Sequence, residues 1–308
     1  MTPVRLQTFL AVVDSGSARA AAQRLSVTES AVSASLAALR REVGVVLFER
    51  DGRGLRLTES GEVFAGYARR ILGLIDEGVA ATRRGPAAER GRLRLGAVTT
   101  AGESLVPGLL ASFRRRYPQV AVTLDVGVRD RISALLADHR LDVVIGGRPG
   151  PGLVTRATRA NALVVVAAAG PEPDLATATW LLREVGSGTR EATLALHQAL
   201  QIEPPLLTLG SVGAVVSSAV LGLGVTLVSA DAVEQQLRGG ALRRVPARGT
   251  PLRRPWHAIT STAPTATTEL FLAHLTDPRQ AGALAFRGTA GSPRATPARV
   301  KPTGPAHP

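Results

Sequence analysis

The first 58 residues carry the pattern that most narrows the possible folds of this chain: two short helices joined across a tight turn. Small and apolar residues recur at the spacing that lets such helices pack together, namely Ala22, Leu25, Val27, Val32 and Leu36. Residues 25–27 then form the turn, and the hydroxyl of Thr28 can cap the second helix by accepting from a backbone N–H in its first turn. The pattern predicts a helix-turn-helix.

The second of these helices offers a small and polar surface. Its first turn and its solvent-facing positions hold Thr28, Glu29, Ser30, Ser33, Ala34 and Ser35. Side chains of this size suit the close approach of a helix to the major groove of DNA. Any alanine-rich helix pair would give the same spacing, so the helix pair alone leaves both interpretations open.

A basic hairpin follows the helix pair. Residues 49–58 read ERDGRGLRLT, in which an Asp-Gly turn signal separates short strand-like runs. Arg50, Arg53 and Arg56 lie on or beside the turn, where guanidinium groups can bind phosphates or enter a narrow minor groove. We therefore expect a wing, and the combination favours double-stranded DNA as a partner.

A single long amphipathic helix is expected from Glu59 to about Arg84, because two acids in its first turn favour a helix start. Its apolar residues recur at near-heptad spacing: Val63, Phe64, Tyr67, Ile71, Leu74, Ile75, Gly78 and Val79. Such a stripe predicts dimerisation with a second copy, and packing on its own domain is the alternative. Residues 85–91, GPAAERG, break the helix and are expected to form a hinge.

From residue 92 to residue 276, strand-like and helix-like segments alternate, which is the pattern of a parallel sheet with crossover helices. Two α/β lobes fit this length, lobe I over about 92–161 plus 263–276 and lobe II over about 162–262. From Asp277 the chain is rich in Ala, Gly, Pro and Thr without periodicity, so residues 277–308 are expected to be a disordered tail.

Two segments suit an anionic ligand. Ligands of open α/β sheets gather where strands end and helices begin, because free backbone N–H groups and the helix dipole attract anions there. Thr99 and Thr100 follow the first strand, and residues 184–190, EVGSGTR, open a helix with Ser187, Thr189 and Arg190. A plain helix cap would have the same composition as this second segment.

Composition narrows the function classes. The chain has no cysteine, which excludes disulfides, thiolate metal sites and a cysteine nucleophile, and its five histidines are scattered without a His-x-x-x-His pair. We expect no metal, no cofactor and no enzymatic constellation. Without a leader or a membrane-spanning apolar run, the chain is expected to be soluble and cytoplasmic. The net charge of +13 is almost entirely arginine, for which coding bias is a sufficient explanation.

The N-terminal segment resembles the winged helix-turn-helix of LysR-type transcriptional regulators. The matching residues are Leu6, Phe9, Gly16, Ser17, Ala21, Ala22, Leu25, Val27, Thr28, Ala31, Val32, Ser33, Leu39, Gly44, Leu47, Phe48, Glu49, Arg50, Leu57, Thr58 and Gly61. The resemblance implies a DNA-binding transcription factor with a dimerising linker helix and a periplasmic-binding-protein-like effector domain. It implies a homodimer or homotetramer, with RNA polymerase as a further candidate partner.

The resemblance also assigns residues. DNA contacts are expected at Ser17, Thr28, Glu29, Ser30, Ser33, Ala34, Arg50 and Arg53, and effector contacts at Thr99, Thr100, Gly147, Ser187, Thr189 and Arg190. Four phrases, at residues 99–100, 146–149, 186–190 and 251–256, resemble the CbbR-like branch of RuBisCO-operon regulators. That branch responds to phosphorylated sugars or nucleotides, which implies a small anionic metabolite as effector.

The recognition helix departs from the family pattern. The family usually has Gln where Glu29 stands, Pro near Ser30, a basic residue near Ala34 and Gln near Ser35. A glutamate at position 29 would accept from a cytosine amino group instead of pairing with adenine. The alternative function is that of a solute-binding or sensor protein whose N-terminal helices serve oligomerisation.

Overall fold

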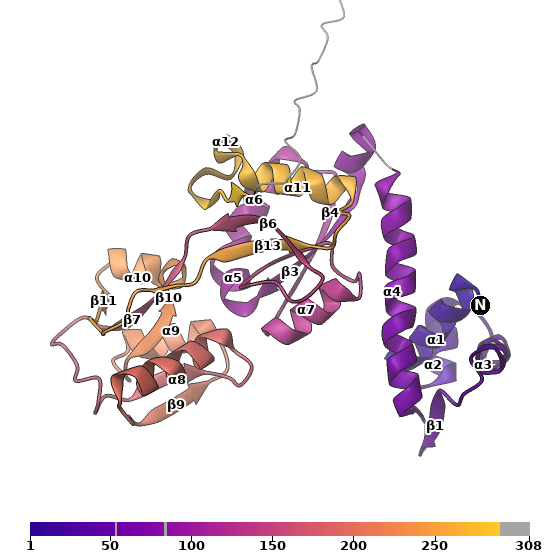
Figure 1. Ribbon diagram of the computed structural model, residues 1–308, viewed down its shortest axis with the longest axis horizontal. Helices are drawn as coiled ribbons and strands as arrows, with labels where there is room; N and C mark the ends of the chain where they lie inside the picture. Colours follow the sequence, from indigo (N-terminus) through magenta and orange to yellow (C-terminus); the bar gives the residue numbers. More distant parts are fainter. Residues whose placement is uncertain (53, 83–84, 290–308) are drawn as a thin grey trace, which may run out of the picture.

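The computed structural model describes residues 1–52, 54–82 and 85–289, and Arg53 lies outside these ranges. Along the chain come a helix-turn-helix with a wing, a long helix and a two-lobed α/β domain (Figure 1). The long helix stands between the helix-turn-helix and the first lobe.

The helix-turn-helix forms as predicted, from α1 (Pro3–Ser15), α2 (Ala18–Leu25) and α3 (Glu29–Val43). Ser26 ends α2 in the left-handed conformation, with φ of 54°, and so turns the chain toward α3. The Thr28 hydroxyl accepts a hydrogen bond from the backbone N–H of Ala31 at 3.2 Å, which confirms its predicted capping role.

The wing is a two-stranded antiparallel hairpin of β1 (Phe48–Asp51) and β2 (Gly54–Leu57). Phe9 is fully buried at the base of the hairpin, and its ring centroid lies 5.2 Å from those of both Phe48 and Phe64. These aromatic contacts fix the wing and the start of the long helix against α1.

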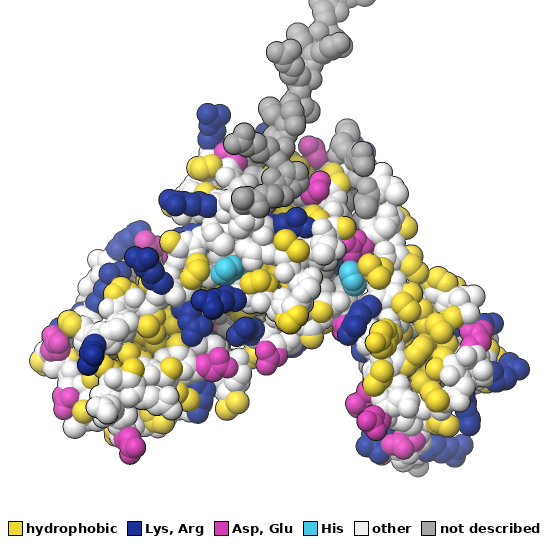
Figure 2. All heavy atoms as spheres, viewed as in Figure 1, with side chains coloured by type: hydrophobic (Ala, Val, Ile, Leu, Met, Phe, Trp, Pro, Cys, Tyr) yellow, Lys and Arg dark blue, Asp and Glu magenta, His cyan; other side chains and the backbone are white. Residues whose placement is uncertain are grey.

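The long helix α4 spans Glu59–Ala81, and residues 83 and 84 at the predicted end lie outside the described residues. Ala65 and Ala68 are buried against the helix-turn-helix, whereas most of the predicted apolar stripe is exposed (Figure 2). The exposed members are Val63, Tyr67, Ile71, Leu74, Ile75 and Val79. A short 3₁₀ helix, η1 (Gly85–Arg90), occupies the predicted hinge.

Lobe I is a six-stranded sheet in the order β14-β6-β13-β5-β3-β4. Its strands are β3 (Arg92–Val98), β4 (Ala121–Gly127), β5 (Val143–Gly146), β6 (Val154–Arg159), β13 (Trp256–Thr260) and β14 (Arg287–Gly288). Its helices are α5 (Thr99–Ser104), α6 (Val106–Arg116), α7 (Arg129–Ala137), α11 (Ala266–Thr276), α12 (Pro278–Ala281) and η3 (Gly282–Leu284). Phe113 and Phe271 lie at the centre of its core.

Lobe II holds two smaller sheets around buried Trp180. Its strands are β7 (Ala162–Ala168), β8 (Trp180–Arg183), β9 (Leu206–Leu209), β10 (Thr226–Ser229), β11 (Leu242–Arg244) and β12 (Leu252–Arg253). Its helices are α8 (Gly188–Leu200), α9 (Val212–Val220), η2 (Ala230–Val233) and α10 (Glu234–Arg238).

The prediction of parallel sheets holds only in part, because several strand pairs are antiparallel. Strand β3 is parallel to β4 and β5, but β13 runs antiparallel to both β5 and β6, and β7 is antiparallel to β10, β11 and β12. The reason is that the chain leaves lobe I after β6 and returns through β13, so these two neighbouring strands run in opposite directions. Residues 256–260 consequently belong to lobe I, not to lobe II.

The predicted tail begins too early. Residues 277–289 are ordered: Phe286 is 2% exposed and packs into the lobe I core, and Arg287 and Gly288 pair with β6. Isolated apolar residues in a polar context gave no periodic signal here, although they bury against an existing core. The rest of the expected tail, residues 290–308, lies outside the described residues.

Candidate effector-binding and DNA-binding sites

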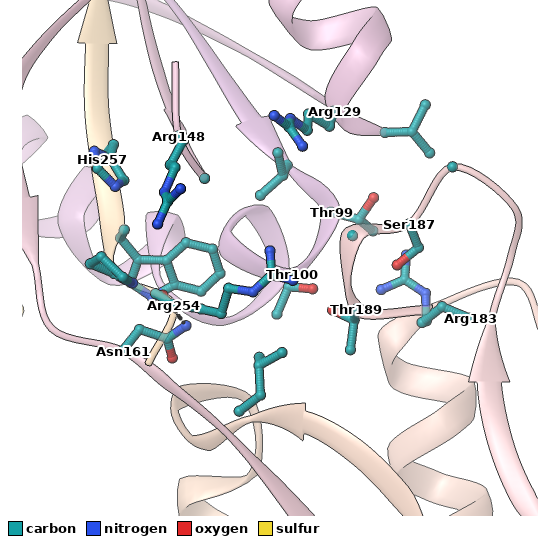
Figure 3. Close-up of a pocket in the computed structure, with 18 of the residues that line it drawn as sticks. Thr99, Thr100, Arg129, Arg148, Asn161, Arg183, Ser187, Thr189, Arg254 and His257 are labelled. Carbon is teal, nitrogen blue, oxygen red and sulfur yellow. Dashed lines mark hydrogen bonds between the residues drawn. The ribbon is translucent and has the colours of Figure 1, made fainter. Parts of the chain in front are cut away.

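A cavity of about 520 Å³ lies between the two lobes, and both lobes line it (Figure 3). Lobe I contributes the carboxyl ends of β3, β4 and β5. Lobe II contributes the end of β8 and the first turn of α8, and the crossover segments around Asn161 and Arg254 complete the wall. This is where the sequence placed a ligand, because strands of both lobes end here.

Five of the six predicted effector residues line this cavity: Thr99, Thr100, Gly147, Ser187 and Thr189. Thr100 and Ser187 are each 8% exposed, so their hydroxyls lie in the wall and not on the outer surface. Ser187 is the N-cap residue of α8, and Gly188 and Thr189 of the first helical turn face the same space. Contact of these residues with an effector stays a prediction.

Arg190 is not part of the cavity lining. Its Nη1 donates to the carbonyl oxygen of Arg183 at 2.9 Å and to Oγ1 of Thr208 at 3.1 Å. The helical step of 100° per residue turns position 190 away from the side on which Thr189 faces the cavity. Arg190 therefore ties α8 to β8 and β9, and the structure does not bring it together with the other five predicted effector residues.

Arginines define the electrostatics of the cavity, and none of those in its lining was among the predicted effector residues. Among the described residues, the lining holds five arginines and no carboxylate. They come from separate segments, at positions 129, 148, 183, 253 and 254. Scattered along an arginine-rich chain, they looked like composition bias, and only the fold brings them together.

Arg183 is the most buried of these arginines, at 4% exposed. Its Nε and Nη2 donate to the two carboxylate oxygens of Glu184 at 2.7 and 2.6 Å. Burial raises the pKa of Glu184, but the hydrogen bonds from Arg183, a hydrogen bond from the backbone of Glu184 and the charge of Arg183 together outweigh burial, so the pKa lies below its ordinary value. Glu184 is therefore ionised at neutral pH and holds the guanidinium in place.

The other four arginines of the lining form no ion pair within the described part of the chain. Arg148 and Arg254 lie with His257 at one end of the cavity, whereas Thr99, Ser187, Thr189 and Arg183 gather at the other (Figure 3). These four arginines are exposed, and like charges around one cleft repel one another unless an anion binds there or solvent ions screen them. The lining of the cavity is therefore positively charged, which suits an anionic ligand.

His257 adds a titratable group to the cationic end. Burial lowers its pKa, and the nearby charge of Arg148 lowers the pKa further, so the ring is neutral at pH 7. Its Nδ1 lies 3.3 Å from Oγ1 of Thr155, and its buried Nε2 has no hydrogen-bond partner among the described residues. A ligand oxygen at this end could supply that partner.

Asp231 of lobe II holds the crossover strands beside the cavity. One of its carboxylate oxygens accepts from the indole N–H of Trp256 at 2.8 Å and from Arg159 at 2.6 Å. Asn161 donates to the carbonyl oxygen of Arg254 at 2.9 Å and accepts from Ser229 at 2.7 Å. Both crossovers are thereby held by lobe II residues at the point where they pass the ligand space.

The predicted DNA-binding face is largely exposed at the N-terminal end of α3. Glu29, Ser30, Ser33 and Ala34 are exposed, as are Thr28 and the wing residue Arg50. Ser17 caps α2 by accepting from the N–H of Ala20 at 3.2 Å, so it has a structural role whether or not DNA is bound. The individual DNA contacts stay predictions, and Arg53 falls outside the described residues.

Within the described ranges there is no cluster of three or more His, Cys, Asp or Glu side chains able to hold a metal ion. No helix of the described chain has the length and apolarity needed to cross a membrane.

A winged helix-turn-helix followed by a charged cleft between two α/β lobes defines a class of ligand-responsive DNA-binding regulators. Two family models match, the bacterial regulatory helix-turn-helix of the lysR family over residues 4–62 and the LysR substrate binding domain over residues 86–278. The chain belongs to the LysR family of transcriptional regulators. The helix-turn-helix match also sets aside the alternative of a sensor protein without DNA binding.

Similarity to individual proteins agrees with this placement. The chain is 32% identical to the transcriptional regulator CbbR of Rhodospirillum rubrum over 83% of this chain and 88% of that protein. The fold superimposes on full-length CbnR in complex with its target DNA with a TM-score of 0.62 at 23% identity, covering 88% and 97% of the two chains. The regulatory domain of Synechocystis CcmR in complex with 2-PG matches with a TM-score of 0.53 at 26% identity, covering 59% of this chain and 94% of that domain.

Proposed function

We propose that this regulator responds to a small phosphorylated metabolite that binds between the lobes and carries more than one negative charge. The observation that supports this most directly is the cavity lining, which holds five arginines and no carboxylate among the described residues. Guanidinium groups bind phosphate oxygens in pairs of parallel hydrogen bonds, and the first turn of a helix adds backbone N–H donors.

In this proposal, each end of the cavity binds one anionic group of the metabolite. Ser187, Thr189 and the first turn of α8 would bind one anionic group, with Thr100 opposite them and Arg183 behind. Arg148 and Arg254 would bind a second group at the crossover end. The 2-PG complex of CcmR and the likeness to CbbR support an effector of this chemical class.

In the proposed mechanism, two copies joined along α4 place their recognition helices on half-sites about one helical turn of DNA apart. The effector shifts a pre-existing equilibrium between two arrangements of the assembly by binding one of them more tightly. A homotetramer, contact with RNA polymerase, action in the cytoplasm and the absence of catalysis are parts of this proposal.

The experiment is a thermal-shift screen of the purified chain against phosphorylated metabolites, with inorganic phosphate and pyrophosphate as simple probes. We expect polyanionic compounds to raise the melting temperature, and the paired substitution Thr100→Val with Ser187→Ala to remove most of that rise. The matched control is Thr123→Val with Ser217→Ala, two exposed hydroxyl residues outside the cavity. An unchanged shift in the cavity variant would show that the ligand binds elsewhere.

A further inference from the structure

The second half of α4 lies against lobe I through a set of polar contacts. One carboxylate oxygen of Glu77 accepts a hydrogen bond from Oγ of Ser261 at 3.0 Å, and the other lies 2.7 Å from Nδ1 of His139. Nε of Arg70 donates to the carboxylate of Asp138 at 3.2 Å. The Glu77 and His139 side chains are 14% and 18% exposed, so their contact is largely shielded from water.

The backbones also approach closely at this interface. A Cβ added at Gly73 of α4 would lie 2.1 Å from Cβ of His139, which is far inside van der Waals contact. His139 itself adopts a left-handed backbone conformation, with φ of 55°. The helix therefore fits against this turn with no space to slide, and the polar contacts fix its rotation.

The two lobe I elements that lead to Asp138, His139 and Ser261 both start at the effector cavity. A further contact with α4, between Arg92 at the start of β3 and Asp76 at 3.6 Å, joins two exposed side chains. Helix α7 begins at Arg129, in the cavity wall, and ends next to Asp138 and His139. Strand β13 begins at Trp256, also in the cavity wall, and ends next to Ser261. Their lengths, 9 and 5 residues, correspond to about 13 Å of helix and about 16 Å of strand.

Both elements are held rigidly between these ends. Strand β13 is hydrogen-bonded to β5 on one side and to β6 on the other, and Ala258 at its centre is fully buried. Helix α7 packs Ile132 and Leu136 into the lobe I core at 0% and 1% exposed. Close-packed interiors transmit a displacement and do not absorb it. A shift of Arg129 or Trp256 at the cavity must therefore move the surface that holds α4.

We propose that α7 and β13 form a two-armed relay from the effector cavity to the linker helix, in which Glu77 is the positioning residue that receives both arms. Glu77 touches neither effector nor DNA. It joins the ends of the two arms to the helix that sets the spacing of the recognition helices in the dimer. This inference rests on the proposed function, because it assigns how an anion between the lobes changes DNA binding.

The test measures the coupling between the two ligands in the full chain. The probe is pyrophosphate, and the DNA is a duplex selected in vitro for binding by this chain. The measured quantity is the ratio of the DNA dissociation constants without and with saturating pyrophosphate. Coupled sites in proteins typically change each other's affinity about 5- to 150-fold. We expect a ratio in this range for the unsubstituted chain.

Glu77→Ala should bring the ratio to within about twofold of one, while calorimetry shows pyrophosphate binding to the cavity unchanged. Glu77→Gln, which keeps the Ser261 hydrogen bond but loses the charge, should give an intermediate ratio. Glu172→Ala breaks the exposed ion pair with Arg243 on lobe II and is the matched control that keeps the full ratio. A purely stabilising role for Glu77 would lower the melting temperature and leave the ratio intact.

Two results overturn the relay: a full ratio in Glu77→Ala, or pyrophosphate that binds the cavity of the unsubstituted chain without changing DNA affinity. If pyrophosphate does not bind at all, the proposed effector class is wrong. The relay is then tested separately, by hydrogen exchange of the ligand-free protein. Glu77→Ala, unlike Glu172→Ala, should raise amide exchange at residues 128–131 and 255–258, at the cavity ends of the arms. Unchanged exchange there also overturns it.

Discussion

Arg183 and Glu184 are neighbours in sequence, and their side chains form a two-pronged ion pair in the cavity wall, with N···O distances of 2.7 and 2.6 Å. The pair gives the protein a built-in counter-charge for a guanidinium that is 4% exposed. Glu184 uses Nε and Nη2 of Arg183, which is a lining residue of the cavity, and Nη1 is not part of this pair. The pair thus keeps the anion-free state stable without neutralising the cavity.

Glu184→Gln should lower the free energy of unfolding of the anion-free protein by about 1 to 2 kcal/mol, because a buried guanidinium loses its charged partner. A bound anion would compensate for that loss. We therefore expect the rise in melting temperature with pyrophosphate to be larger in the variant than in the unsubstituted chain. Equal rises in calorimetric scans would show that Arg183 does not sense the anion.

The depressed pKa of His257 predicts a pH dependence of effector binding. A bound anion would offset the charge of Arg148, one of the two causes of the depression, and would raise the pKa of His257 toward its ordinary value of 6.5. Anion binding then takes up a proton, so affinity should increase as pH falls through this range and level off above it. Sulfate, fully ionised throughout, is the probe for titration calorimetry.

His257→Gln is the control for this pH dependence. It should flatten the dependence of sulfate affinity on pH while leaving binding at pH 8 within about twofold. Without an anion, the effect of pH on the free energy of unfolding has the opposite sign. Because the pKa of His257 is lower in the native protein than in the unfolded chain, the unfolded chain takes up the proton first. The free energy of unfolding therefore falls as pH drops below 6.5. An affinity profile with the same slope in His257→Gln would assign the titration to another group.

Glu29, at the start of the recognition helix, is expected to influence both the affinity and the base preference of DNA binding. Glu29 is the first residue of α3, and its exposed carboxylate would face phosphates or a cytosine amino group. Glu29→Gln should tighten binding to random duplex about threefold, since removing one repulsive charge in water is worth about 0.5 to 1 kcal/mol. Sites selected in vitro should shift from C toward A at one position per half-site. Unchanged selection would exclude Glu29 from base recognition.

The exposed stripe of α4 predicts the oligomeric state. Leu74 is 55% exposed in the single chain, and a second copy packed along the stripe would bury it. Leu74→Glu should convert dimers or larger assemblies to monomers in sedimentation runs and weaken binding to paired half-sites at least tenfold. Leu221→Glu, at a site 78% exposed on lobe II, is the matched apolar-to-acid control. A Leu74 variant that sediments like the control would place the dimer contact elsewhere.

Local rules predicted the fold of the first 58 residues well. The Thr28 cap, the turn at Ser26 and the wing at residues 49–58 depend on neighbours a few residues away, so the sequence specifies them directly. The same holds for Thr100 and Ser187, which lie where a strand ends and a helix begins. Such positions can be found from the order of elements alone.

The remaining features depend on contacts between distant segments. The direction of β13 follows from the double crossover between the lobes, and periodicity within one strand carries no information about its neighbours. Arg129 and Arg148 enter the cavity because β4 and β5, which flank β3 and run parallel to it, end at the same edge of the lobe I sheet. Arg190 lies outside the cavity lining because its guanidinium reaches Thr208, whose position depends on the pairing of β9 with β8.

The central claim is that an anion bound between the lobes changes how this chain binds DNA. The most direct measurement is a nuclease footprint of the purified chain on the DNA upstream of its own gene, with and without the phosphorylated compound that gives the largest thermal shift. We expect protection of two symmetry-related half-sites about one helical turn apart. The compound should change the length or strength of that protection, and the change should disappear in the chain with both Thr100→Val and Ser187→Ala. No protection at all, or a footprint that the bound compound leaves unchanged, would contradict the account.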